Sequence, residues 1–338
     1  MQTSRELVYD TLSFKNPPRV PRDMWALPWA VTNYKEEYEA LVRDFPRDVD
    51  TVPNYLKTPT IESGEPYEPG LFTDMWGCTF LNKLKGVHGE VKTPLVQDED
   101  WADFSKVHIP VELFTSDTDK INRFCANTDK FVFAGARPQI FEQMQYIRGT
   151  EQLYMDIVLG NEAMTGALKQ VHDFYCELLI QWAKTDVDAL FFLDDWGSQN
   201  SLLINPASWC EIFRPLYKDY VDIAHSYGKK IFMHSDGNIL SVIPHLIELG
   251  VDALNCQMFC MDADELAKFA GQITFWGEID RQWLLPCGTT EEIENAVKRV
   301  YSTLWKDGGC IAQCEFGPGA KPENVRTVYE TWNTIHNR

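Results

Sequence analysis

The strongest constraint on the fold is an alternation of short apolar runs with amphipathic segments, which begins after Lys130. The runs are nearly continuous, as is typical of parallel strands that are covered on both faces. They lie at residues 131–134, 189–193, 231–233, 253–255, 273–276 and 310–312. The intervening segments carry apolar residues three and four apart, a spacing that predicts helices at 206–227, 239–249, 262–269, 290–305 and 322–336.

Strands that alternate with helices predict a parallel sheet, and strands expected near residues 20–27 and 72–76 would bring the number to eight. We therefore expect an α/β fold, a (β/α)8 TIM barrel with an N-terminal helical and loop extension. Residues 1–338 are expected to form this single domain, with residues 1–70 as the irregular extension. The alternative is a doubly wound open sheet, but no G-x-G-x-x-G motif follows any strand, which disfavours a dinucleotide-binding version.

The composition narrows the class of partner. The chain has 50 Asp and Glu against 31 Lys and Arg, a net charge of −19, which argues against binding to nucleic acid or to an anionic membrane. No run approaches the roughly 18 apolar residues of a membrane helix, and the first residues lack the pattern of a secretory signal. We therefore expect a cytoplasmic protein whose nine cysteines are reduced thiols.

Polar side chains recur where the predicted strands end, which is where a barrel places its active site. In strand order they are Arg137; Asp194, Asp195 and Trp196; His234 and Asp236; Cys256 and Gln257; Glu278 and Asp280; and Cys314 and Glu315. A set that contains a histidine, an acid pair and two cysteines is difficult to explain by solvation of loops alone. These residues are therefore the candidates for the chemistry.

Three of the candidates could hold a metal. His234, Glu278 and Cys314 would supply nitrogen, oxygen and sulfur from three strands and leave a position open, which is typical of catalytic zinc. Asp236 could orient the imidazole or bind the metal itself. An inert loop histidine and a buried thiol are the alternatives for His234 and Cys314, and the weaker candidate ligands are Cys256 and Cys260.

The other candidates could act on a substrate. Asp194 and Asp195 are adjacent, so only one of them can face the end of the barrel, where it could position a substrate or accept a proton. Arg137 could bind a carboxylate or a phosphate, with a salt bridge as the structural alternative.

Two stretches carry a resemblance to a known family: the run from Asp194 to Gln257, which contains GKKIFMHSDGNIL, and the C-terminal GGCIAQCEFGPGAKPENV. They resemble the uroporphyrinogen decarboxylase superfamily of (β/α)8 barrels over roughly residues 130–338. The arginine-rich N-terminal stretch with which true decarboxylases bind tetrapyrrole carboxylates is missing, and Cys314 stands where they have a histidine. The chain is therefore more similar to the superfamily's zinc-dependent, corrinoid-linked methyltransferases.

That branch implies the transfer of a methyl group between a small molecule and a corrinoid (cobalamin) carrier. The methyl group is bound to a heteroatom of the small molecule, which is a methoxylated compound or a thiol. An O-demethylase component is the favoured version. The branch's His-x-Cys zinc motif matches at His234, whereas Asp236 replaces its cysteine; its distant cysteine matches Cys314. Either Asp236, Glu278 or Cys256 would then complete the ligand set.

The resemblance also implies Zn²⁺ as cofactor and a separate corrinoid protein as partner, and it leaves a homodimer open. Asp194, Asp195 or Asp236 would act on the substrate, and Trp196 and Trp276 would wall its pocket. The alternatives are a metal-free decarboxylase of a smaller acid and a non-catalytic binder of a corrinoid or tetrapyrrole.

Overall fold

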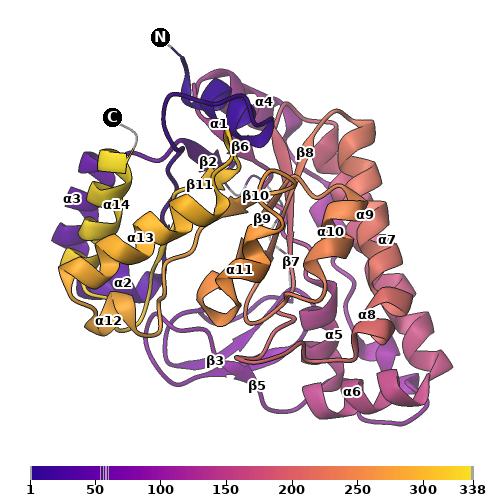
Figure 1. Ribbon diagram of the computed structural model, residues 1–338. Helices are drawn as coiled ribbons and strands as arrows, with labels where there is room; N and C mark the ends of the chain where they lie inside the picture. The colour runs from indigo at the N-terminus through magenta and orange to yellow at the C-terminus, as the bar shows by residue number, and fades with distance from the viewer. Residues whose placement is uncertain (1, 54, 56, 58, 60, 336–338) are drawn as a thin grey trace.

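A seven-stranded parallel sheet forms the centre of the protein and curls into a barrel-like wall (Figure 1). The computed structural model describes residues 2–335 except 54, 56, 58 and 60. The strand order is β11-β10-β9-β8-β7-β6-β2. The strands are β2 (Val49–Thr51), β6 (Phe131–Phe133), β7 (Ala189–Leu193), β8 (Lys230–Ser235), β9 (Ala253–Cys256), β10 (Thr274–Trp276) and β11 (Cys310–Ile311).

The chain around β1 (Trp25–Ala26) closes this wall. β1 pairs in parallel with β12 (Glu315–Phe316), which follows β11 in the chain. On that side Ala312 N donates a hydrogen bond to Pro21 O at 2.8 Å; on the other side Asp48 N donates to Arg22 O at 2.8 Å. The segment near residues 20–27 thus takes the eighth place, and the predicted α/β barrel fold is confirmed.

The strand predicted near residues 72–76 belongs to a different sheet, so its assignment to the barrel was wrong. β3 (Gly70–Thr73) pairs antiparallel with β4 (Thr79–Asn82), which pairs with β5 (Glu90–Val91). The barrel uses β2 instead. Its sequence Val-Asp-Thr has one apolar residue and is three residues long, so it gives no strand pattern.

Helices cover the outside of the wall (Figure 1). The predicted helices are confirmed with three differences: 206–227 is divided at Phe213, ahead of Pro215; the helix expected at 239–249 begins at Ile243; and residue 336 lies outside the described residues. Proline lacks the N–H that a continuous helix would need there. The helices are α1 (Ser4–Leu12), α2 (Pro28–Asn33), α3 (Lys35–Asp44), α4 (Thr118–Ala126), α5 (Ile140–Arg148), α6 (Thr150–Leu159), α7 (Glu162–Ala183), α8 (Pro206–Ile212), α9 (Arg214–Ser226), α10 (Ile243–Leu249), α11 (Ala263–Ala267), α12 (Leu284–Cys287), α13 (Thr290–Leu304) and α14 (Pro322–Ile335).

Aromatic side chains fill the inside of the barrel. Phe133 stacks on Trp276 with ring centroids 5.2 Å apart, and Phe232 meets both rings edge-on. We call the end of the barrel where the strands have their carboxyl ends the mouth. The packed rings form a rigid floor beneath it. All nine cysteines are unpaired, and no described helix has the length and apolar character needed to cross a membrane.

Candidate active site

His234, near the end of β8, is held in one orientation at the mouth. Its Nδ1 lies 2.6 Å from Asn255 Oδ1, and Asn255 Nδ2 donates to the carbonyl of Trp276. Because the amide nitrogen of Asn255 is engaged by that carbonyl, its oxygen accepts the proton of Nδ1. The other ring nitrogen, Nε2, is then directed at the side chains of Asp195 and Asp236.

Two carboxylates face Nε2 of His234. Asp195 Oδ1 is 3.4 Å away and Asp236 Oδ1 is 3.5 Å away. The three candidate ligand atoms lie within 4.8 Å of one another, which is close enough for them to share one metal ion. Asp236 Oδ1 is buried and receives no hydrogen bond from the described residues, so it has a lone pair to offer.

The carboxylates also change the proton affinity of the imidazole. Burial lowers the pKa of His234, but the hydrogen bond to Asp195 and the charge of Asp236 outweigh this effect and raise the pKa to about 9. The site therefore favours positive charge at Nε2, and a divalent cation would satisfy the same preference.

Two glycines bring the carboxylates together. Gly237 has φ +76°, and a Cβ added to it would lie 2.1 Å from Gly197 O. The loops after β7 and β8 therefore cross at backbone contact, which glycine alone permits. Gly197 N donates to Asp236 O at 2.9 Å, and Asp236 N donates to Asp195 Oδ1 at 2.9 Å.

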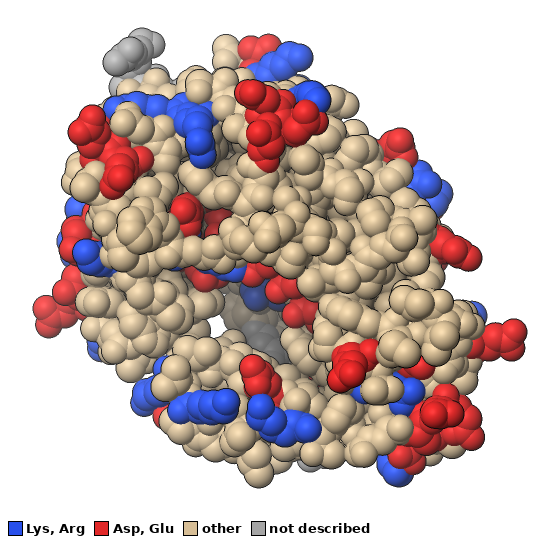
Figure 2. Space-filling view, turned by 60° about the horizontal axis from the view of Figure 1, so that its bottom comes forward, with Lys and Arg blue, Asp and Glu red and all other residues tan. Residues whose placement is uncertain are grey.

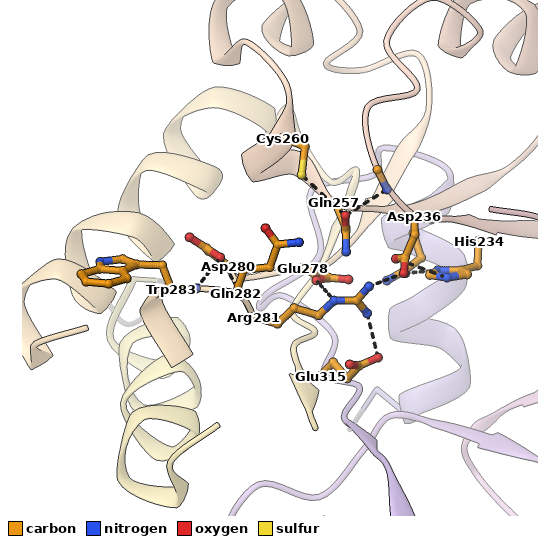
Figure 3. A network of polar contacts seen from close by, with 12 residues as sticks. His234, Asp236, Gln257, Cys260, Glu278, Asp280, Arg281, Gln282, Trp283 and Glu315 are labelled. Atoms are coloured by element: carbon orange, nitrogen blue, oxygen red, sulfur yellow. Dashed lines mark hydrogen bonds and ion pairs between the residues drawn. The ribbon is translucent and has the colours of Figure 1, made fainter. Parts of the chain in front are cut away.

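Arg281, in the loop after β10, connects Asp236 of this group to two further carboxylates (Figure 3). It pairs with Asp236, with Glu315 at 2.9 Å and with Glu278 at 3.6 Å. Burial raises the pKa of Glu278 to about 8 although Arg281 opposes the shift, and Glu278 Oε1 has no donor among the described residues. Carboxylates outnumber cations around His234 and Arg281, so this part of the mouth is suited to a bound cation such as a metal ion.

The structure does not assemble the predicted set of His234, Glu278 and Cys314. Cys314 Sγ lies 3.6 Å from Tyr329 Oη on α14, while the side chain of the next residue, Glu315, reaches Arg281. Neighbouring residues of an extended chain point to opposite sides, so Cys314 is directed toward the helix layer. Burial raises the pKa of its thiol to about 12.

The remaining candidate metal ligands lie apart from the group around His234. In the described part of the chain, one further group of three side chains could hold an ion; it lies on the outer helices and consists of His172, Cys176 and Asp219. Burial raises the pKa of Cys256, and Cys260 Sγ is 3.5 Å from Gln257 Oε1. Neither thiol joins the group around His234.

Asp194 and Trp196 lie behind the mouth rather than in it. Asp194 is fully buried; its Oδ1 accepts from the backbone of Phe141 and Glu142 at the start of α5, and Tyr217 donates to its Oδ2 at 2.5 Å. The Trp196 ring is also fully buried and stacks on Phe141 at 3.9 Å. Of the acid pair, Asp195 is thus the member that faces His234.

A cavity of about 550 Å³ opens at the mouth, and Figure 2 shows this face hollowed at its centre. Trp25 and Trp276 form part of its wall. Both indoles donate to Asp23 Oδ2 at 3.1 Å, which fixes the two rings. A second cavity, of about 660 Å³, is lined by residues of β3, β4 and α7; Arg137 and Tyr67 line both.

Three residues of the site were missed by sequence reasoning: Asn255, Arg281 and Glu142. Glu142 is the third residue of α5, and burial together with the charge of Asp195 raises its pKa to about 7. Tyr146 donates to its Oε1 at 3.1 Å. Asn255 could have been identified from the sequence, because it is the last residue of a predicted strand. No local sequence pattern marks Arg281 or Glu142 as a site residue.

Comparison with known proteins decides the family. The family model for uroporphyrinogen decarboxylase matches residues 91–335. The chain belongs to the uroporphyrinogen decarboxylase family. No curated protein matches the sequence.

A solved structure of similar fold supports the barrel architecture. A methyltransferase from Methanosarcina mazei is 14% identical, with a TM-score of 0.67, and the match covers 99% of this chain and 100% of that one. An endo-β-1,4-xylanase from Gloeophyllum trabeum is 12% identical, with a TM-score of 0.45, over 94% of this chain and 98% of the other. At 14% identity the likeness to the methyltransferase is one of fold.

Proposed function

We propose that this protein is the methyltransferase of a corrinoid-linked system. It would move a methyl group between a heteroatom of a small molecule and a corrinoid on a separate protein, as an O-demethylase component. Family membership and the methyltransferase-like fold support an enzyme of this kind. The observation that carries the proposal is the Asp195–His234–Asp236 group at the mouth.

The donor atoms of this group fit a divalent ion such as Zn²⁺. One imidazole nitrogen and two carboxylate oxygens are ligands that zinc accepts, and the lone pair of Asp236 Oδ1 has no other partner among the described residues. Asn255 supplies the outer hydrogen bond that fixes a metal-binding histidine. Zn²⁺ at this site would act as a Lewis acid toward the heteroatom that carries the methyl group. Glu278 and Cys314 have no part in this version of the ligand set.

The remaining residues would prepare the substrate. Trp25 and Trp276, fixed by Asp23, would hold an apolar body beside His234. Glu142, with its pKa of about 7, would hold or release a proton next to Asp195 near neutral pH.

Methyl transfer is the direct test. Zinc-loaded protein should demethylate a methoxylated compound with Co(I)-cobalamin, or methylate a thiol from methylcobalamin. The variant His234→Ala should lose this activity. The matched control His225→Ala should keep it, since His225 lies at the end of α9 and pairs with Asp252 at 3.1 Å.

Two outcomes would contradict the proposal. Metal-independent decarboxylation of a small acid would favour a decarboxylase. Corrinoid binding without methyl transfer to any donor or acceptor would favour a non-catalytic binder.

A further inference from the structure

Arg137 is a cation with no ion-pair partner among the described residues. It follows β6 at the mouth, its side chain is exposed to the cavities, and it lines both of them. In the described part of the chain no carboxylate lies within 4.0 Å of its guanidinium and no group forms a hydrogen bond with it. Its guanidinium carbon lies over the face of the Phe191 ring, 5.9 Å from the ring centroid.

Three other arginines that lie partly or fully inside the protein are paired with carboxylates. Arg47 donates to Asp23 at 2.8 Å, Arg148 to Asp156 at 2.7 Å, and Arg281 to Glu315 at 2.9 Å. Burial lowers the pKa of Arg137, and the more distant charge of Asp23 does not offset this effect. The salt bridge that would have explained Arg137 structurally is therefore not formed with any described residue.

We propose that Arg137 binds the carboxylate group of the substrate. A guanidinium presents its N–H donors in a planar fork that matches the two oxygens of a carboxylate. Phe191 and Trp276 line the mouth cavity together with Arg137 and His234, and they would enclose an apolar body. The substrate class is thus a small organic carboxylate; that its other end carries the methyl group rests on the proposed function.

Binding of benzoate as a probe tests the assignment. The indoles of Trp25 and Trp276 at the mouth provide a fluorescence signal. Benzoate should bind the wild-type protein saturably, and its affinity should fall at least about tenfold in Arg137→Gln, because a charge-assisted pair is lost. Benzamide, which has the same shape and no charge, should bind both proteins alike. Equal benzoate affinity in the two proteins, or no binding to the wild type, would overturn the assignment.

Further variants separate this test from folding and from the metal. Arg137→Gln should keep the wild-type melting temperature, since its guanidinium has no described partner to lose, and Arg137→Lys should show intermediate affinity. Arg43→Gln is the matched control, because Arg43 is 71% exposed on α3. Benzoate should still bind His234→Ala, so a failure of methyl transfer would leave this result intact. Tighter binding of inorganic phosphate than of benzoate would overturn the choice of a carboxylate.

Discussion

The substitution Asn255→Leu separates the orientation of His234 from its presence. Asn255 is fully buried and joins two groups, the Nδ1 of His234 and the carbonyl of Trp276. Leucine has a similar size and can serve neither group. Each buried polar group left without a partner costs about 1–3 kcal/mol, so the free energy of unfolding should fall by about 2–6 kcal/mol. Zinc affinity should fall about 10–100-fold, the usual effect of removing the outer partner of a metal-binding histidine.

Urea unfolding followed by tryptophan fluorescence measures the first quantity, and competition with a chromophoric chelator measures the second. Asn324→Leu is the matched control. Asn324 is also buried, and its Nδ2 donates to three carbonyls, those of Leu284, Leu285 and Gly288, away from the mouth. The control should lose stability and keep its zinc affinity. Wild-type zinc affinity in Asn255→Leu, or an equal loss in both variants, would refute the reasoning.

Three further substitutions test the architecture of the site. Gly237→Ala should abolish zinc binding and lower the melting temperature, because its Cβ would collide with Gly197 O; a variant with both properties unchanged would contradict the loop crossing. Cys314→Ser should retain wild-type zinc affinity in the chelator assay, since the thiol faces Tyr329; zinc loss would return Cys314 to the ligand set. Tyr217→Phe should cost about 1–3 kcal/mol in urea unfolding, because it removes the donor to the buried Asp194; an unchanged midpoint would show that this hydrogen bond contributes nothing.

The sequence predicts most of the barrel because its strands are buried on both faces and therefore read as apolar runs. β7, for example, has the predicted bounds of residues 189–193. β2 is not predicted, because it has three residues and one apolar side chain, which is too short for a recognisable strand pattern. The segment at 70–73 has a strand-like composition, but its pairing with β4 is a tertiary property that composition does not contain.

The sequence predicts which positions lie near the site, but it does not predict the direction in which each side chain points. The rule that strand ends carry the chemistry finds His234, Asp195 and Asp236, which the structure brings together. It also leads to Cys314, although the adjacent Glu315 is the residue that faces the mouth. A shift of one residue reverses the face, and β12 is too short to reveal its alternation. Arg281 meets Asp236 across 45 residues of sequence, a separation that no local pattern encodes.

The X-ray absorption spectrum of the zinc-loaded protein tests the central claim most directly. The claim is that His234, Asp195 and Asp236 hold the ion. Nitrogen and oxygen ligands alone should then appear, at about 2.0–2.2 Å from the metal. The scattering from the outer atoms of the imidazole ring should disappear in His234→Ala. A sulfur ligand at about 2.3 Å would contradict the account, since it would require a cysteine in the first coordination sphere.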